Sequence, residues 1–289
     1  MKKLFIVLAL ISMGATLVAQ QDASDLYVPG ATNTIKPLSE PPGQYIPNKA
    51  PGDPVLYDNG PLITNPGVGF GGADASVLQT SLGMNTYGFG HQVLANNWVA
   101  DDFTVPAGGW NIGGYGFYAY QTSSGLTSTL TAVHLIIYDG VPGAGGTNIV
   151  FGDETTNRLT SSNFTNIYRV TDDLLLSTSR PIMLNDCKFN LSLAAGTYWV
   201  AWQTDGTLAS GPWAPPISIL GQTTTGNGMQ KLNQEPWGPT LDVTGQQGLP
   251  FLIYGQTQGP NEVPVSNWAL IIGIALITIM IILRFRRLV

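Results

Sequence analysis

Few residues in this 289-residue chain have the types and spacing that catalysis or metal binding needs. A serine triad or a zinc site needs histidine, and the chain has two, His91 and His134. Neither lies in a Gly-x-Ser-x-Gly or His-Glu-x-x-His motif. His134 alternates with apolar Ile136 in a β-rich run, which predicts a structural histidine, and His91 follows a glycine in an expected loop. Neither histidine is expected to be catalytic.

Three adjacent acid pairs could supply oxygen ligands to calcium: Asp101–Asp102, Asp153–Glu154 and Asp172–Asp173. Adjacent side chains on a strand point to opposite faces, so one such pair cannot hold one ion. None has the Asp-x-Asp-x-Asp-Gly spacing, and nothing in the sequence sets two acids at the separation of a glycosidase pair. We expect solvated loop ends, no catalytic residue and no metal site, with Ca²⁺ as the one cofactor left open.

Aromatic residues are densest between residues 196 and 216. Alternation in an expected strand puts Trp202 on one face and a partly exposed Trp199 on the other, while prolines flank Trp213 and Trp237. A platform of Trp199, Trp213 and Trp237 could stack a sugar ring. The alternative, which the sequence favours, is that these tryptophans seal the ends of the domain.

The elements that must position these residues are short β-rich runs separated by Gly, Pro, Asn and Asp. Together they predict an all-β fold, a jelly-roll-like β-sandwich over residues 54–254, as a single domain. Expected strands cover residues 54–57, 92–98, 102–105, 110–120, 131–138, 148–151, 166–170, 181–183, 188–193, 196–203, 217–220, 229–232 and 249–254.

Composition agrees with a turn-rich exported domain. The chain has 35 Gly and 20 Pro, and only 10% of its residues are charged, against about 25% in typical soluble proteins. Outside the two termini, seven basic residues stand against eighteen acidic ones, a formal charge of −11. Such a surface repels phosphate, so no nucleic-acid partner is expected, whereas neutral sugars remain compatible.

Cysteine usage is minimal. Cys187 is the one cysteine, so the chain has no internal disulfide. It alternates with Phe189, Leu191 and Leu193, which predicts a buried, unreactive thiol.

The N-terminus has the form of a secretory signal peptide, residues 1–20. Lys2 and Lys3 precede an apolar run, and small residues from Ala15 to Ala19 offer a cleavage site. Residues 21–53 follow as a proline-rich leader or linker, because proline at this density disrupts both helices and sheet ladders.

At the other end, a spacer over residues 255–262 is expected to precede a membrane or sorting tail, residues 263–289. Residues 269–283 carry no charge, and from residue 265 the segment is just long enough to span a bilayer core as one transmembrane helix. Trp268 lies at one end and Arg284, Arg286 and Arg287 at the other, which predicts that the arginines stay cytoplasmic and the domain faces outward.

This tail resembles the C-terminal sorting signals of Gram-negative surface proteins known as PEP-CTERM and IPTL-CTERM. The residues that carry the resemblance are Pro264, Ser266, Asn267, Trp268, Arg284, Arg286 and Arg287. The resemblance implies a sorting protease as a partner, and the sequence leaves open whether the tail is cut or stays as an anchor. Residues 99–106 and 196–225 look like exported bacterial sandwich proteins of unassigned function.

The sequence therefore predicts an exported cell-envelope protein with a non-catalytic β-sandwich, serving surface structure or adhesion. It would contact membrane lipid through its C-terminal helix or be sorted to the surface after cleavage. One alternative is a carbohydrate-binding module that uses its tryptophans on an extracellular glycan. A second alternative is an extracellular hydrolase.

Overall fold

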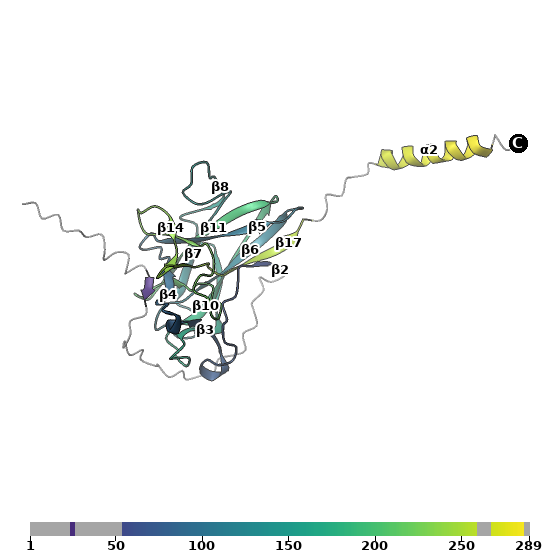
Figure 1. The fold of residues 1–289 in the computed structure, drawn as a ribbon. Helices are drawn as coiled ribbons and strands as arrows, with labels where there is room; N and C mark the ends of the chain where they lie inside the picture. The colour runs from purple at the N-terminus through teal and green to yellow at the C-terminus, as the bar shows by residue number, and fades with distance from the viewer. Residues whose placement is uncertain (1–23, 27–53, 259–266, 286–289) are drawn as a thin grey trace, which may run out of the picture.

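The computed structural model describes residues 24–26, 54–258 and 267–285 (Figure 1). In these residues the fold is all-β apart from two 3-10 turns, η1 (Phe70–Gly72) and η2 (Thr80–Leu82), and one C-terminal α-helix. The strands are β1 (Ser24–Leu26), β2 (Val55–Asp58), β3 (Asp74–Leu78), β4 (Thr86–Gly90), β5 (Trp98–Val105), β6 (Trp110–Ala119), β7 (Leu130–Tyr138), β8 (Ile149–Asp153), β9 (Leu159–Thr171), β10 (Pro181–Leu193), β11 (Gly196–Gly206), β12 (Trp213–Ala214), β13 (Met229–Lys231), β14 (Gly238–Pro239), β15 (Leu241–Asp242), β16 (Gly245–Gln246) and β17 (Phe251–Thr257). The helix is α2 (Asn267–Phe285).

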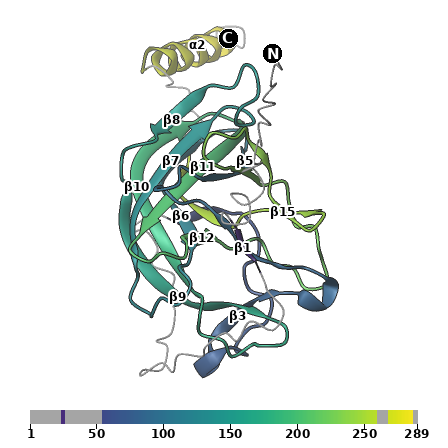
Figure 2. The same cartoon turned by 90° about the vertical axis from the view of Figure 1, so that its left-hand side faces the viewer.

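Two six-stranded sheets form the body of the domain. The β6 sheet has the order β2-β17-β6-β10-β9-β3, and the β11 sheet has the order β14-β13-β5-β11-β7-β8. All pairings in them are antiparallel except β3 with β9. Both sheets curl, and the long strands β9 and β10 run along one side of the molecule (Figure 2). A smaller sheet, β1-β4-β12, lies beside them.

The main core joins the two large sheets. It combines Phe103 and Trp202 of the β11 sheet with Trp110, Phe117 and Phe251 of the β6 sheet. The rings of Phe117 and Trp202 stack at a centroid distance of 4.7 Å. Alternation along β11 therefore works as the sequence predicts, with Trp202 facing the other sheet.

Two predicted strands are one strand in the structure. Residues 181–183 and 188–193 belong to β10, which continues through Asn185 and Asp186. We expected a break there because Asn and Asp favour turns. Both side chains are buried and hydrogen-bonded instead: Asn185 donates to the Phe117 carbonyl at 3.0 Å, and Asp186 accepts from Tyr254 Oη at 3.1 Å.

The predicted strand over residues 92–98 is wrong, because most of this stretch is a loop. Asn96 has φ = 51°, a left-handed conformation that interrupts a strand. The nearby strand is β4, which was not predicted because its glycines are unfavourable in strands. A Cβ at Gly88 would lie 2.7 Å from Tyr120 Oη, so only glycine fits this close approach.

The expected strand over residues 217–220 is also absent, since this segment makes single backbone hydrogen bonds rather than a ladder. Ile217 donates to the Gly248 carbonyl at 2.8 Å and Ser218 to the Pro61 carbonyl at 2.9 Å. β17 runs to Thr257, three residues into the expected spacer.

Cys187 is fully buried in the main core, as predicted, and burial raises the pKa of its thiol.

Helix α2 covers most of the predicted C-terminal tail. Seven of its large apolar side chains are 52–66% exposed: Ile272, Ile274, Leu276, Ile277, Ile279, Met280 and Ile281. Among the residues that the structure describes, no helix has the length and hydropathy of a membrane span.

A buried aspartate links the two sheets. Asp101, in β5, is 2% exposed and accepts hydrogen bonds from Asn59 Nδ2 (3.0 Å) and from the Leu249 N–H (2.7 Å), which flank strands of the β6 sheet. The Asp102 N–H is a third donor at 2.8 Å. Burial raises the pKa of Asp101 to about 7, although these donors oppose the rise.

We predict that Asp101 makes folding pH-dependent. An unfolded Asp loses its proton near pH 4, whereas the folded protein keeps it to about pH 7, so this contribution to stability is largest at low pH and is lost by pH 7. Relative to Asp101→Asn, which does not titrate, the wild-type free energy of unfolding should fall by about 3 kcal/mol from pH 5 to pH 8. Urea unfolding of both proteins across this pH range measures the difference. If the free energy of unfolding changes with pH by the same amount in the wild type and in Asp101→Asn, the raised pKa of Asp101 is refuted.

Candidate functional site

Three loops that are distant in sequence line one groove with a volume of about 1180 Å³. The first loop covers residues 92–97 between β4 and β5. The second follows β11 and reaches β12, and the third includes β13 and β14 and reaches Leu241. Because all three leave strands of the packed body, the groove has rigid supports on each side.

A buried amide holds the first and third loops together. Asn97, 6% exposed, donates through Nδ2 to Gln92 Oε1 at 2.9 Å, and its Oδ1 accepts the Asn233 N–H at 3.1 Å. Gln230 Nε2 also donates to the Gly90 carbonyl at 2.8 Å, which joins β13 to the end of β4. These contacts fix the groove without help from a ligand.

Carboxamides and carboxylates provide the groove's polar surface. Asn96 Oδ1 accepts from Trp98 Nε1 at 3.1 Å, which leaves the Asn96 amide nitrogen without a partner among the described residues. Asp205 Oδ1 accepts the Gly206 N–H at 2.9 Å, and Glu235 is exposed on the third loop. The lining residues include no Lys, Arg or His.

Trp213 contributes to the groove but is mostly buried. It is 7% exposed, packs with Tyr87 and Tyr120 in a second apolar cluster, and donates from Nε1 to Ser210 Oγ at 3.3 Å. Only a small part of the ring is therefore accessible. Leu94, on the opposite loop, is 96% exposed at the groove.

The other two predicted tryptophans lie elsewhere. Trp199 and Trp237 share an apolar cluster on the outer face of the β11 sheet, away from the Trp213 cluster. Trp199 is 6% exposed, which corrects our expectation of a partly exposed ring, because Trp237 and Met229 pack against its cluster. The three rings do not form one platform.

Neither histidine lines the groove. His91 is in a loop as predicted but is fully buried, with Nδ1 3.4 Å from the Phe89 carbonyl, and burial lowers its pKa to about 3. His134 Nδ1 lies 3.0 Å from Gln203 Nε2, and its pKa is also lowered by burial. Both are neutral side chains at physiological pH.

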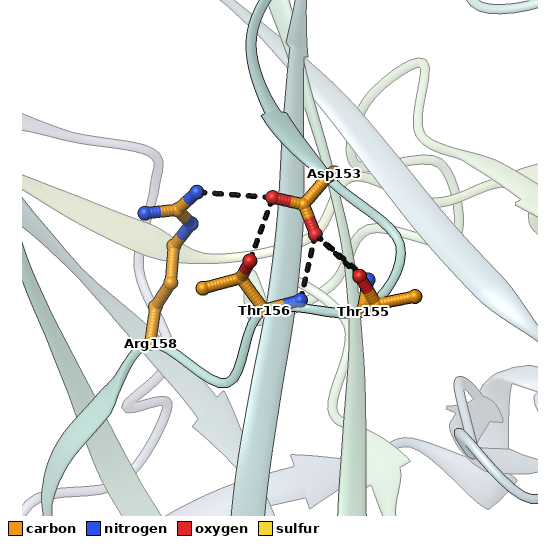
Figure 3. A network of polar contacts seen from close by, with 4 residues as sticks. All are labelled: Asp153, Thr155, Thr156 and Arg158. Carbon is orange, nitrogen blue, oxygen red and sulfur yellow. Dashed lines mark hydrogen bonds and ion pairs between the residues drawn. The ribbon is translucent and has the colours of Figure 1, made fainter.

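Acids from all three pairs accept hydrogen bonds from the protein itself. Asp153 caps a turn, accepting the N–H groups of Thr155 (2.9 Å) and Thr156 (2.6 Å) and contacting Arg158 Nη2 at 3.3 Å (Figure 3). These donors, the Thr155 N–H first, lower the pKa of Asp153. Asp102 accepts from Asn227 Nδ2 at 2.8 Å, separately from the donors to Asp101.

Asp172 joins two segments that are distant in sequence, accepting the Ser81 N–H at 2.9 Å and the Thr80 hydroxyl. Across the described ranges, no three His, Cys, Asp or Glu residues gather as a metal site would require.

The residues of the predicted sorting signal fall at the edge of what the structure describes. Asn267 begins α2, Trp268 is its second residue, and Arg284 lies exposed in its last turn. Pro264, Ser266, Arg286 and Arg287 lie outside the described residues.

The groove itself was missed by sequence reasoning. Its residues come from segments more than 100 positions apart, and single amides such as Asn97 and Asn233 read simply as turn residues. The pairing Asn96-Asn97 near a tryptophan was the available signal, but it does not say which other loop the amides meet.

We predict that Asn97→Ala loosens the groove. Losing both hydrogen bonds should lower the free energy of unfolding by about 1–2 kcal/mol and speed hydrogen exchange at the Asn233 amide. Gln234→Ala is the matched control, because Gln234 lines the same groove, is exposed and makes no side-chain hydrogen bond within the described residues. Equal stability of both variants would contradict the role of Asn97.

Comparison with known proteins adds no relative. No protein-family model, no curated protein and no solved structure matches this chain.

Proposed function

We propose that the protein is an exported, non-catalytic cell-envelope protein whose β domain serves adhesion or surface structure and is held or sorted by its C-terminal helix. The observation that carries this proposal is the exposed apolar surface of α2, where Leu276, Met280 and five isoleucines are more than half exposed. Apolar surface of this extent favours lipid as its surroundings. The arginines after residue 283 and the N-terminal signal pattern support an orientation in which the arginines are cytoplasmic and the β domain faces outward.

For the domain, we propose the jelly-roll-like β-sandwich that the sequence favours. The two curled six-stranded sheets with one shared core support it. A sandwich of this kind presents loops at its ends, and loops on a rigid scaffold are common binding surfaces.

The anchor predicts a clear change of location. Expressed from its own gene, the full chain should fractionate with membranes, whereas a chain ending at Glu262 should appear in the soluble exported fraction. Mass spectrometry of the native C terminus then separates two fates: an intact Arg287 indicates permanent anchoring, and a cut near Pro264 indicates sorting. A full chain found in the cytosol would overturn the proposal.

A carbohydrate ligand is the second candidate, and the groove favours it over the expected tryptophan platform. Its lining combines amide groups of Gln92 and Asn96, the carboxylates of Asp205 and Glu235, and a small accessible part of Trp213. Polar groups of this kind match sugar hydroxyls, and indole surface packs against sugar C–H groups.

The hydrolase alternative gains one observation, since Asp205 and Glu235 line the same groove. A glycosidase needs two carboxylates flanking the scissile bond, one as acid and one as base or nucleophile. Binding without cleavage is the function we propose, and release of reducing ends from a bound glycan would instead support hydrolysis.

Glycan binding is tested by replacing groove amides. On a glycan array, the wild-type domain should bind at least one oligosaccharide, and the double variant Gln92→Ala, Asn96→Ala should bind about tenfold or more weakly, because about two hydrogen bonds are lost. Gln256→Ala, an exposed amide of β17 outside the groove, is the control. An empty array would count against a carbohydrate ligand.

A further inference from the structure

We propose that the groove selects uncharged, hydroxyl-rich chains and discriminates against anionic glycans. This inference rests on the proposed carbohydrate-binding function of the groove and deepens it by assigning the ligand's charge.

Carboxamides in the groove keep their donor groups for a ligand. Gln92 uses Oε1 to accept from Asn97, and Asn96 uses Oδ1 to accept from Trp98. In the described part of the chain, neither amide nitrogen has a partner of its own. Each of these two residues therefore offers N–H donors that carry no formal charge.

The acceptors in the groove are carboxylates. Asp205 uses Oδ1 for the Gly206 N–H, which leaves Oδ2 without a partner among the described residues. Glu235 is exposed and likewise has no side-chain hydrogen bond there. A sugar hydroxyl accepts from an amide and donates to a carboxylate at the same time, so it satisfies both kinds of group.

A negatively charged sugar would be repelled by the carboxylates of the groove. It would bring its carboxylate or sulfate close to Asp205 and Glu235, and the lining residues offer no cation to neutralise it. Arg169 and Arg180 are buried, and Arg158 is paired with Asp153. Lys231 is the basic residue nearest in sequence to the lining residues. It lies between Gln230 and Leu232, which line the groove, but it does not line the groove itself.

A cationic ligand fits less well than a neutral one. The carboxylates would attract it, but the amide nitrogens of Gln92 and Asn96 are donors and cannot accept a hydrogen bond from a cation. An ammonium group has three donors and no acceptor, so it leaves those N–H groups unsatisfied.

The test compares oligosaccharides of equal length that differ in charge. Binding of the full-length protein is measured by calorimetry or array for a neutral glucan, its carboxylated or sulfated counterpart, and an amino-sugar oligomer. The neutral chain should bind at least about tenfold more tightly than the anionic one at low salt, and the gap should narrow at about 1 M salt, where screening is strong.

Isosteric variants locate the effect. Glu235→Gln or Asp205→Asn should raise affinity for the anionic chain several-fold relative to the neutral one, whereas Glu154→Gln, an exposed acid outside the groove, should change neither. Equal or tighter binding of the anionic chain, or tightest binding of the amino-sugar oligomer, would overturn this inference while leaving glycan binding intact. Failure of all three chains to bind a folded protein would instead overturn the proposed carbohydrate-binding function.

Discussion

A carboxylate buried between the two large sheets constrains how these sheets pack against each other. Asp101 lies on the inner face of β5, level with the apolar core, and its donors come from Asn59 and Leu249 beside strands of the other sheet. A buried polar group is costly unless its hydrogen bonds are complete. The two sheets must therefore meet in a register that brings these donors to one carboxylate, which apolar packing alone does not specify.

A second buried polar group, Arg169, constrains the packing next to the groove. Arg169, 1% exposed in β9, donates to the carbonyls of Tyr87 (2.8 Å) and Thr86 (3.3 Å) and to Ser218 Oγ (2.9 Å). Burial lowers its pKa to about 10, so it keeps its charge at neutral pH. By satisfying carbonyls of β4, it fixes the strand from which the first groove loop departs.

The groove inherits its rigidity from this framework. β4 ends at Gly90, whose carbonyl accepts from Gln230, and the loop that follows is closed by Asn97. The amides of Gln92, Asn96 and Asn97 are held by contacts within the protein, so a ligand would have to order few of these side chains. The two carboxylates then give the groove the same negative sign as the formal charge of the chain between its two ends.

Much of the fold follows from local pattern. Alternation located most of the long strands, including β6, β7 and β11, and put Trp202 and Cys187 in the core. It failed where a residue type carries a local meaning that tertiary contacts override. Asn185 and Asp186 suggested a turn but pair with buried partners inside β10, and the glycines of β4 suggested a loop but allow a close approach to Tyr120.

The sequence by itself determined the class of fold, the buried thiol and the acidic balance of the domain, because these depend on composition and on period-two alternation. It also supplies the pattern of the two ends, on which the proposed location rests. The tertiary structure alone decided which amides and acids share a groove and that Trp199 is covered. Such sites form from residues far apart in the chain, and their meeting depends on the packing of whole sheets, which no local pattern records.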